Sequence, residues 1–336
     1  MSTPLVDVHI HYMPSALLRA YRARATPPMI EDDGSSLVLR YGSGYVERIA
    51  TASTDPTNLI RTLDRAGIDI AVLSINQPGV LGLPPDDACI TAREANDELT
   101  ELVKNSGGRL AGMATLPWQC PREATEELRR AVSVGLCGAM VCSNVSGRSL
   151  DEEQFEPLFA TSESLDVPLL LHPTVPLSIA TLGEYGLTCS VGFLFDTTTA
   201  ILRLVLGGLF DRYPALKIIV GHSGSLLPQL AGRLDLESAR GAIVTGPNKS
   251  GLLSENYLRR LYTDSVSGSV PPLVSAIHLF GSDRVMFGTD FPFWDPSASV
   301  NVLNQLSLPE HDLDRIRGGN AMELFRLEQA NRPSSS

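Results

Sequence analysis

The 336-residue chain is poor in basic residues, in cysteine and in long apolar runs. Its 27 lysines and arginines stand against 38 acidic residues, which gives a formal net charge of -11. No lysine-rich or arginine-rich stretch offsets this charge, so the sequence argues against a nucleic-acid partner. No apolar run approaches the length of about 20 residues that spans a bilayer, so we expect no membrane partner. No basic segment followed by an apolar one opens the chain, so no secretion signal is predicted.

The five cysteines are scattered along the chain. An odd number without a C-x-x-C pair indicates free thiols in a reducing compartment, so we predict a cytoplasmic protein. At 43% hydrophobic and 19% charged residues, the composition is that of an ordinary globular protein. A chain of this length has enough apolar side chains to bury a large core.

Short apolar segments alternate with amphipathic segments along the chain. Continuous apolar runs are typical of strands buried on both faces of a sheet. We place eight strands at residues 5–10, 68–74, 109–115, 137–143, 167–173, 216–222, 261–265 and 284–290. Helices are expected at 56–66, 86–106, 121–134, 151–165, 197–211, 226–239, 270–280 and 298–307. This rhythm predicts an α/β fold, a distorted (β/α)8 TIM barrel, because an open doubly wound sheet would place a glycine-rich loop after its first strand.

Residues 19–48 interrupt the rhythm. The segment "SSLVLRYGSGYVERI" alternates apolar and polar residues around a Gly-Ser-Gly centre, which predicts a small β-hairpin inserted after the first strand. No linker or break in composition divides the chain. We therefore predict a single barrel domain over residues 1–330, with a disordered tail at 331–336.

Two histidines, His9 and His11, stand in the first predicted strand, at its C-terminal end. Residues two apart in a strand project to the same face, and the C-terminal rim of a barrel holds the active site. Two imidazoles at this rim can chelate one metal ion. Histidines packed in the core are the alternative, because the H-x-H spacing alone does not distinguish the two.

More metal-binding residue types fall at the ends of predicted strands. His172 ends the fifth strand, His222 ends the sixth, and Asp290 in "FGTDF" ends the eighth. Imidazoles with one carboxylate suit Zn²⁺ or another borderline divalent ion and leave a position for water or substrate. Asp290 is a candidate ligand, proton carrier or both, although a carboxylate in such a turn can also cap a helix. His278 and His311 fall in helix or loop segments and are interpreted as surface or packing residues.

These motifs together resemble the amidohydrolase superfamily. The segments "LLLHP", "DRYPALKIIVGHSG" and "VMFGTDFPF" are most similar to its amidohydrolase-related branch, which includes aminocarboxymuconate-semialdehyde decarboxylase and γ-resorcylate decarboxylase. The resemblance covers essentially the whole chain. It implies one divalent metal ion, zinc as the first expectation and manganese as the second, bound by His9, His11, His172 and Asp290. It also implies that His222 is the catalytic residue that polarises the substrate or activates the metal-bound water, with Asp290 carrying the proton.

The number of metal ions follows from the fourth predicted strand. Binuclear members of the superfamily have a carboxylated lysine at the end of this strand. Here the strand reads "CGAMVCSN" and contains no lysine, which supports a site with one metal ion.

Candidate substrate contacts lie at the barrel mouth. Arg48 falls about where decarboxylases of the branch use an arginine, although a solvated hairpin charge fits equally well. Phe291, Phe293 and Trp294 follow the last strand, where they can stack on a planar substrate, plug the barrel or form a subunit contact. Asp264 ends the seventh strand and is expected to form structural hydrogen bonds.

The resemblance favours a metal-dependent nonoxidative decarboxylase, a carboxy-lyase, that acts on a small aromatic or unsaturated carboxylic acid. The same residues also suit a hydrolase of a lactone or cyclic amide, and hydration of an unsaturated dicarboxylate belongs to the same branch. A binding module without catalysis is disfavoured, because all five positions carry chemically competent residues. Relatives are often dimers or tetramers, so a homo-oligomer is expected.

Overall fold

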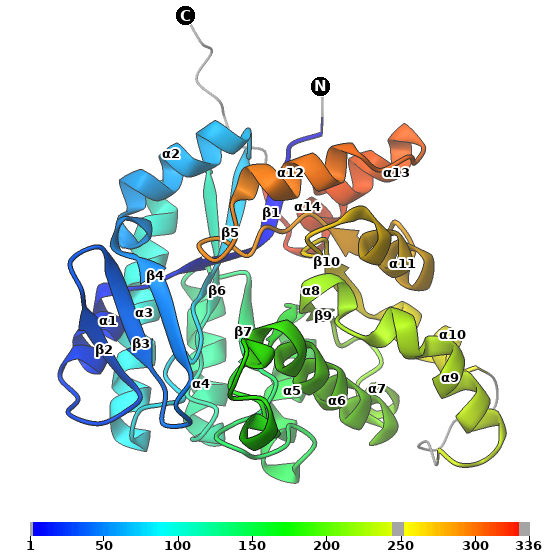
Figure 1. Ribbon diagram of the computed structural model, residues 1–336, viewed down its shortest axis with the longest axis horizontal. Coiled ribbons are helices and arrows are strands. Elements are labelled where there is room, and N and C mark those ends of the chain that lie inside the picture. Colours follow the sequence, from blue (N-terminus) through cyan, green and yellow to red (C-terminus); the bar gives the residue numbers. More distant parts are fainter. Residues whose placement is uncertain (1–2, 244–251, 329–336) are drawn as a thin grey trace, which may run out of the picture.

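The described part of the chain contains eight parallel strands that form a nearly closed barrel (Figure 1). The computed structural model describes residues 3–243 and 252–328, and the predicted tail at 331–336 lies outside these ranges. The strands, in their spatial order, are β1 (Val6–Tyr12), β5 (Ile70–Ile75), β6 (Leu110–Ala114), β7 (Gly138–Cys142), β8 (Leu169–His172), β9 (Ile218–Val220), β10 (Tyr262–Asp264) and β11 (Val285–Met286). The last segment returns to the first, because Val8 N donates to Phe287 O at 3.0 Å and Ile10 bridges Phe291. The predicted TIM barrel is confirmed.

Helices follow the strands and surround the barrel (Figure 1). The longer ones are α2 (Pro56–Ala66), α3 (Pro85–Lys104), α4 (Pro121–Ser133), α5 (Glu156–Leu165), α6 (Phe193–Leu206), α9 (Leu227–Ala239), α11 (Val270–Phe280) and α12 (Pro296–Asn304). Shorter ones are α7 (Leu209–Arg212), α8 (Gly221–Gly224), α10 (Leu253–Asn256), α13 (Glu310–Asp314) and α14 (Asn320–Leu324). Asp55 caps α2, where its side chain accepts a hydrogen bond from Thr57 N at 2.9 Å. Aspartate before a proline at the first helical position is a typical helix start.

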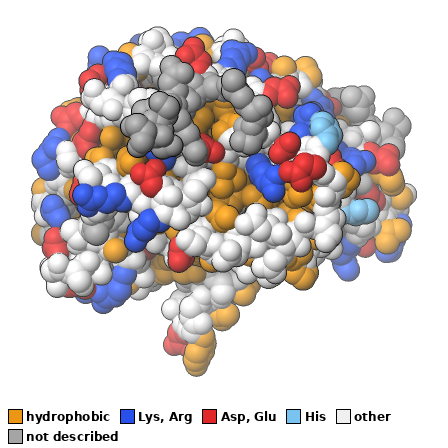
Figure 2. Space-filling view, turned by 90° about the horizontal axis from the view of Figure 1, so that it is seen from above, with side chains coloured by type: hydrophobic (Ala, Val, Ile, Leu, Met, Phe, Trp, Pro, Cys, Tyr) orange, Lys and Arg blue, Asp and Glu red, His pale blue; other side chains and the backbone are white. Residues whose placement is uncertain are grey.

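One helical stretch of the described chain, residues 188–206, is long and apolar enough by length and composition to cross a membrane. Half of it is buried within the structure, where its C-terminal part, α6, contributes Ile201 and Leu204 to the core. Core helices of soluble proteins meet the same criteria, so this stretch is weak evidence for a membrane span. On the face shown in Figure 2, acidic and basic side chains are interspersed.

The inserted segment forms a small antiparallel sheet, as predicted, but it has three strands and not two. Helix α1 (Ser15–Arg22) is followed by β2 (Met29–Asp32), β3 (Ser36–Arg40) and β4 (Val46–Ala50), in the order β2-β3-β4. The Asp33 side chain accepts hydrogen bonds from the backbone N–H groups of Ser35 and Ser36, which closes the turn between β2 and β3. This Asx-type turn, which the sequence analysis did not recognise, adds the extra strand.

Apolar side chains fill the barrel beneath the C-terminal rim. Val72, Met113, Leu170, Ile219 and Met286 belong to one buried cluster, contributed by five different strands. In β8, His172 follows Leu170 by two residues and therefore projects to the same interior face. The packed interior thus supports a layer of polar side chains above it, at the end of the barrel where active sites lie.

Candidate metal centre

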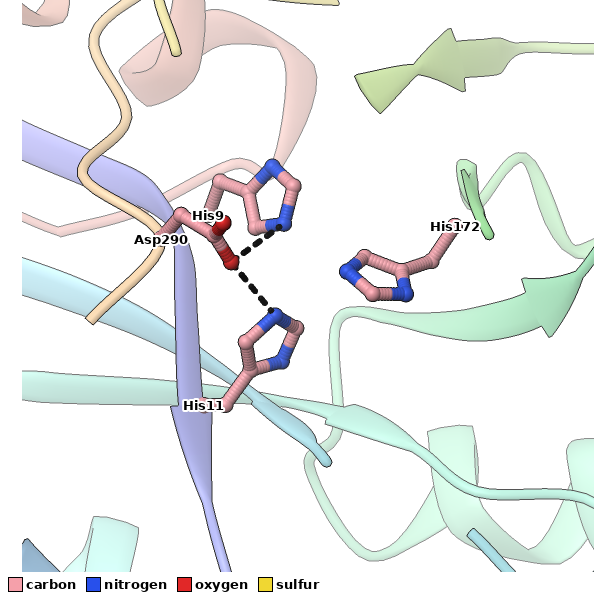
Figure 3. Close-up of side chains that lie close together, drawn as sticks. All are labelled: His9, His11, His172 and Asp290. Atoms are coloured by element: carbon pink, nitrogen blue, oxygen red, sulfur yellow. Dashed lines mark ion pairs between the residues drawn. The ribbon is translucent and has the colours of Figure 1, made fainter. Parts of the chain in front are cut away.

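Four buried side chains converge on one point at the C-terminal rim (Figure 3). Each offers one ligand atom, and these atoms all lie within 4.8 Å of one another in the group His9, His11, His172 and Asp290. The barrel topology brings them together, because β1 supplies two of them, β8 supplies the third, and Asp290 N donates to His9 O at 2.7 Å. The structure therefore brings together the four residues that the sequence analysis proposed as metal ligands.

Each imidazole of this group is held through its outer nitrogen. The Nδ1 atoms have partners at hydrogen-bond distance: His9 with Asp264 Oδ2 (2.6 Å), His11 with Ser74 Oγ (2.8 Å) and His172 with Pro173 O (2.8 Å). A carbonyl or carboxylate oxygen accepts, so His9 and His172 carry a proton on Nδ1 and direct Nε2 towards the centre. A hydrogen bond at the outer nitrogen is the usual arrangement of histidines that bind a metal.

The inner atoms of the group have no hydrogen-bond partner. The Nε2 atoms of His9, His11 and His172 and the Oδ1 atom of Asp290 are all buried and make no hydrogen bond, although Asp290 Oδ1 lies 3.3 Å from His11 Nε2 and 3.5 Å from His9 Nε2 (Figure 3). Burying one unpaired polar atom costs about 1–3 kcal/mol, so four at one point call for a bound group. Three imidazole nitrogens and one carboxylate oxygen fit one divalent metal ion.

Burial and neighbouring charges set the protonation states. Burial lowers the pKa of His9, but nearby carboxylates outweigh it and raise this pKa to about 9. Burial lowers the pKa of His11, and burial with the neighbouring imidazoles holds the pKa of His172 well below its usual range. Burial alone would raise the pKa of Asp290, but the adjacent imidazoles of His11, His222 and His9 hold it well below its usual range. An ionised carboxylate beside neutral imidazoles is ready for a cation, whereas His9 must first release a proton.

A cavity of about 540 Å³ opens onto this group. His172, His222 and Asp290 contribute polar atoms to it, and much of the remaining lining is apolar: Phe193, Leu194, Leu226, Val266, Phe293 and Trp294. His222 Nε2 lies 3.4 Å from Asp290 Oδ2, so the two residues proposed as catalytic face each other. A cavity of this size, apolar with a few convergent polar groups, suits a small-molecule ligand.

Comparison with known proteins decides the family. A model of the amidohydrolase family matches residues 6–327. The chain belongs to the amidohydrolase family. γ-Resorcylate decarboxylase from a Polaromonas species is 37% identical over 285 residues, which cover 80% of this chain and 87% of that enzyme.

Solved structures of other decarboxylases share the fold of this amidohydrolase. 5-Carboxyvanillate decarboxylase from Sphingomonas paucimobilis is similar with a TM-score of 0.86 and 26% identity, and the match covers 97% of this chain and 100% of that one. Dihydroxybenzoic acid decarboxylase from a Polaromonas species matches with a TM-score of 0.78 and 30% identity, covering 98% of each chain. That structure holds manganese and the inhibitor 2-nitroresorcinol. The resemblance inferred from the sequence motifs is confirmed.

Asp264, at the end of β10, connects two parts of the amidohydrolase site. One of its oxygens accepts from His9 Nδ1 and from His222 N at 3.1 Å, and the other accepts from Ser223 N and Val266 N, each at 3.0 Å. His222 and Ser223 have left-handed backbone conformations, with φ of 58° and 54°. Such conformations cost about 1–3 kcal/mol each for residues other than glycine, so the carboxylate stabilises the turn that presents His222 to the cavity.

Replacing Asp264 with asparagine should weaken metal binding. An amide has one acceptor oxygen and cannot take all four hydrogen bonds, so His9 loses its fixed tautomer and orientation. We expect a loss of about 10–100-fold in metal affinity, the usual effect of removing an outer-shell partner. Competition with a chromophoric chelator measures it, with Asp283→Asn at an exposed position as the control. Equal affinity in the two variants would contradict the role given to Asp264.

The three aromatic residues after the last strand divide between two environments. Phe293 and Trp294 line the cavity, and the Phe293 ring lies 5.9 Å from that of His11. Phe291 is not among the lining residues, and its side chain packs against the hydrophobic core. Its carbonyl instead accepts from His11 N at 2.8 Å, so its contribution to the site is through the backbone.

Arg48, predicted as a substrate contact, is not among the residues that line the cavity. Its side chain is 61% exposed and pairs with Asp33 at 2.8 Å on the outer face of the inserted sheet. Glu47, one residue earlier, is buried and lines the cavity. The period of two in β4 was a usable signal, because Tyr45, Glu47 and Ile49 must share one face and two of them are apolar.

A second buried carboxyl group, Asp7, was also missed. Its oxygens accept from Thr289 Oγ1 at 2.6 Å and from Thr289 N and His9 N, each at 3.1 Å. Burial raises the pKa of Asp7 to about 7. Asp7 thus connects the strand that carries His9 and His11 to the loop that carries Asp290. In the sequence Asp7 stands between apolar residues of the first strand, and nothing there indicates this role.

Glu47 should make the stability of the fold depend on pH. Burial raises the pKa of Glu47 from 4.5 to about 7, so between these values the folded protein holds a proton that the unfolded chain has released. The contribution is therefore present at low pH and lost as pH rises towards and past 7. We expect the free energy of unfolding of the wild type, minus that of Glu47→Gln, to fall by up to about 3 kcal/mol from below pH 4.5 to pH 8. Urea denaturation measures this difference, and subtraction cancels groups common to both proteins, such as Asp7.

The exposed Glu31 provides the matched control for this pH dependence. The wild type minus Glu31→Gln should give a nearly flat profile, because solvent weakens the exposed ion pair that Glu31 forms with Arg40. A flat profile for Glu47→Gln as well would show that the buried carboxyl group does not hold the extra proton.

Proposed function

We propose that this amidohydrolase is a metal-dependent nonoxidative decarboxylase of a small aromatic carboxylic acid. The observation that carries the proposal is the group of four buried, unpaired ligand atoms at the base of a largely apolar cavity. The cavity suits a single ring, and the unpaired atoms suit a divalent ion that can bind the acid. The three relatives described above, all decarboxylases of the same family or fold, support this function.

We assign the metal to His9, His11, His172 and Asp290. When bound there, a divalent ion would polarise the oxygens of the substrate carboxylate or of an adjacent hydroxyl group. Three imidazoles favour zinc, whereas the manganese in the structure of one relative favours manganese. Reconstitution of the metal-free protein with each ion would decide between them.

The residues of the chain supply orientation and a proton. Phe293 and Trp294 would pack against the ring and exclude water from it. Asp290, which its neighbours keep ionised, can take a proton at Oδ2 from His222 Nε2 and deliver it to the ring carbon that bears the carboxylate. The bond from this carbon to the carboxylate then breaks, its electron pair restores the aromatic ring, and CO₂ leaves. One proton from solvent returns the pair to its initial state.

The proposal extends to location and assembly. The five cysteines are free, which supports a cytoplasmic protein. The strands of the single barrel come from both ends of the described chain, which supports one domain. Large apolar side chains are exposed at Leu177, Tyr185 and Phe195, all between residues 177 and 195. These residues support a homo-oligomer, because exposed apolar surface can mark a contact with another subunit. Sedimentation of the purified protein would test this part.

Substrate screening tests the proposed reaction. The metal-loaded protein is incubated with a panel of hydroxybenzoates and muconate-like acids, and released CO₂ or bicarbonate is measured. A parallel panel of lactones and cyclic amides covers hydrolysis. We expect CO₂ from at least one aromatic acid and none after metal removal. Turnover confined to the lactones or amides would replace decarboxylation with hydrolysis.

A further inference from the structure

A buried glutamate in the wall of the cavity has no part in the mechanism described above. Glu47 is 6% exposed. One of its oxygens accepts from Tyr41 Oη at 3.1 Å and from Asn76 Nδ2 at 3.3 Å, and the other accepts from Gln77 Nε2 at 3.2 Å. All three partners are neutral, so no protein cation balances the carboxylate when it is ionised, and burial raises its pKa to about 7. A buried charge without a counter-charge is costly, and its presence at a ligand cavity indicates a role in binding.

The side chain of Gln77 carries an acceptor oxygen, Oε1, to which no described group donates a hydrogen bond. Its Nε2 faces Glu47, which fixes the orientation of the amide and leaves Oε1 on the other side. This Oε1 atom is buried and has no hydrogen-bond partner, and Gln77 lines the same cavity. Two adjacent side chains of the wall therefore offer acceptor oxygens, and an acceptor of this kind is satisfied only by a donor from a bound molecule or water.

The charges of the cavity lining also favour a neutral hydrogen-bond donor over a second carboxylate on the substrate. The residues that line it, all of them described, include the carboxylates of Glu47 and Asp290 and no lysine or arginine. A divalent ion with Asp290 and one substrate carboxylate sums to zero charge, which leaves the negative charge that Glu47 carries above pH 7. A second carboxylate on the substrate would add to this charge inside a poorly solvated space, where like charges repel strongly.

We propose that Glu47 and Gln77 select the substrate by accepting a hydrogen bond from a ring hydroxyl group. The enzyme would then take hydroxylated aromatic acids with a single carboxylate and exclude aromatic dicarboxylates. This inference rests on the proposed decarboxylase function and narrows its substrate class. It also explains why the inward-facing position of β4 carries an acidic residue while the arginine beside it faces outward.

Matched sets of acids test the inference on the metal-loaded protein at pH 8, where Glu47 is ionised. Each dihydroxybenzoate isomer is compared with the hydroxybenzoate that lacks one hydroxyl group and with the hydroxyphthalate that carries a carboxylate in its place. For the preferred isomer we expect kcat/KM to exceed that of the dicarboxylate by at least about 100-fold and that of the acid without the hydroxyl by about 10-fold or more. The wild-type series alone decides the preference, whether or not a variant folds.

The Glu47→Gln variant links the preference to this side chain. The change keeps the size and removes the charge, so KM for the preferred dihydroxybenzoate should rise about 10-fold with kcat changed far less, and the discrimination against the dicarboxylate should shrink. Glu31→Gln, on the exposed side of the same small sheet, should leave both unchanged. A dicarboxylate turned over as well as the dihydroxybenzoate, or a Glu47→Gln variant with wild-type ratios, would overturn the inference.

Binding measurements separate this inference from the proposed reaction. If none of the acids releases CO₂, the proposed decarboxylase function is contradicted. Calorimetric titration of the same acids into the metal-loaded protein then still tests whether Glu47 and Gln77 select the ligand. Tighter binding of the dihydroxybenzoate, lost in Glu47→Gln, would support the role of Glu47. Equal or tighter binding of the dicarboxylate would refute it.

Discussion

Replacing His172 with alanine is expected to abolish metal binding and with it all turnover. The His172 side chain is buried, and its Nε2 is one of three imidazole nitrogens at the centre that no protein group satisfies. Its Nδ1 is held by the neighbouring backbone carbonyl, so the ring contributes to the site through Nε2 alone. Alanine leaves one ligand fewer and a space that water can enter. We expect about one divalent ion per chain in the wild type and almost none in the variant, because losing a ligand should exceed the 10–100-fold effect of losing an outer partner.

Elemental analysis after desalting measures the metal content, and thermal unfolding provides a second measurement. An ion present at 100 times its dissociation constant stabilises the folded state by about 2.7 kcal/mol. A chelator should therefore lower the melting temperature of the wild type and leave that of His172→Ala unchanged. His278→Ala, at an exposed position of α11, should behave as the wild type. Full metal content in His172→Ala would remove this residue from the ligand set.

The site could be predicted from the sequence because barrel topology converts positions along the chain into positions in space. Parallel strands end at one rim, so His11, His172 and Asp290 converge although they lie far apart in the sequence. The structural role expected for Asp264 rested on the same logic, and the structure bears it out with four hydrogen bonds. Only the approximate end of each strand was needed.

The inserted sheet could not be predicted so well, because there the relevant choice concerns single residues. A substrate-binding side chain was predicted in this segment at Arg48, whereas the residue of β4 that lines the cavity is Glu47, one position earlier. A one-residue error in a strand exchanges the buried face for the exposed face. Family resemblance suggested an arginine, whereas the alternation of Tyr45, Glu47 and Ile49 indicated which face is buried. The local pattern was the better guide.

Backbone geometry around the site was also beyond sequence analysis. Asp290 has φ of 61°, and residues 222–225 all have positive φ, although only Gly224 among the latter is a glycine. Side chains other than glycine rarely adopt this region, and nothing in "GHSGS" or "FGTDF" requires it. The conformations depend on hydrogen bonds from distant strands, among them those of Asp7 and Asp264. Such strain is typical of functional sites, where the surrounding structure stabilises it.

Replacing His222 with asparagine should leave the metal in place and remove turnover. His222 is not one of the four converging ligands, and its Nε2 faces Asp290 Oδ2 at 3.4 Å. Asparagine is chosen because it tolerates the left-handed backbone of this position better than alanine does. It cannot exchange a proton near neutral pH, so kcat should fall by about 10²–10⁴-fold, the range for loss of a general acid–base group. His311→Asn, at an exposed position, is the control.

The two measurements on this variant distinguish the possible roles of His222. Loss of kcat with about one metal ion per chain retained assigns His222 to proton transfer with Asp290. Loss of metal would make it a ligand, and the donor set at the rim would then have five members. Full activity would show that Asp290 receives its proton from water, because no other described imidazole beside Asp290 lies outside the ligand group.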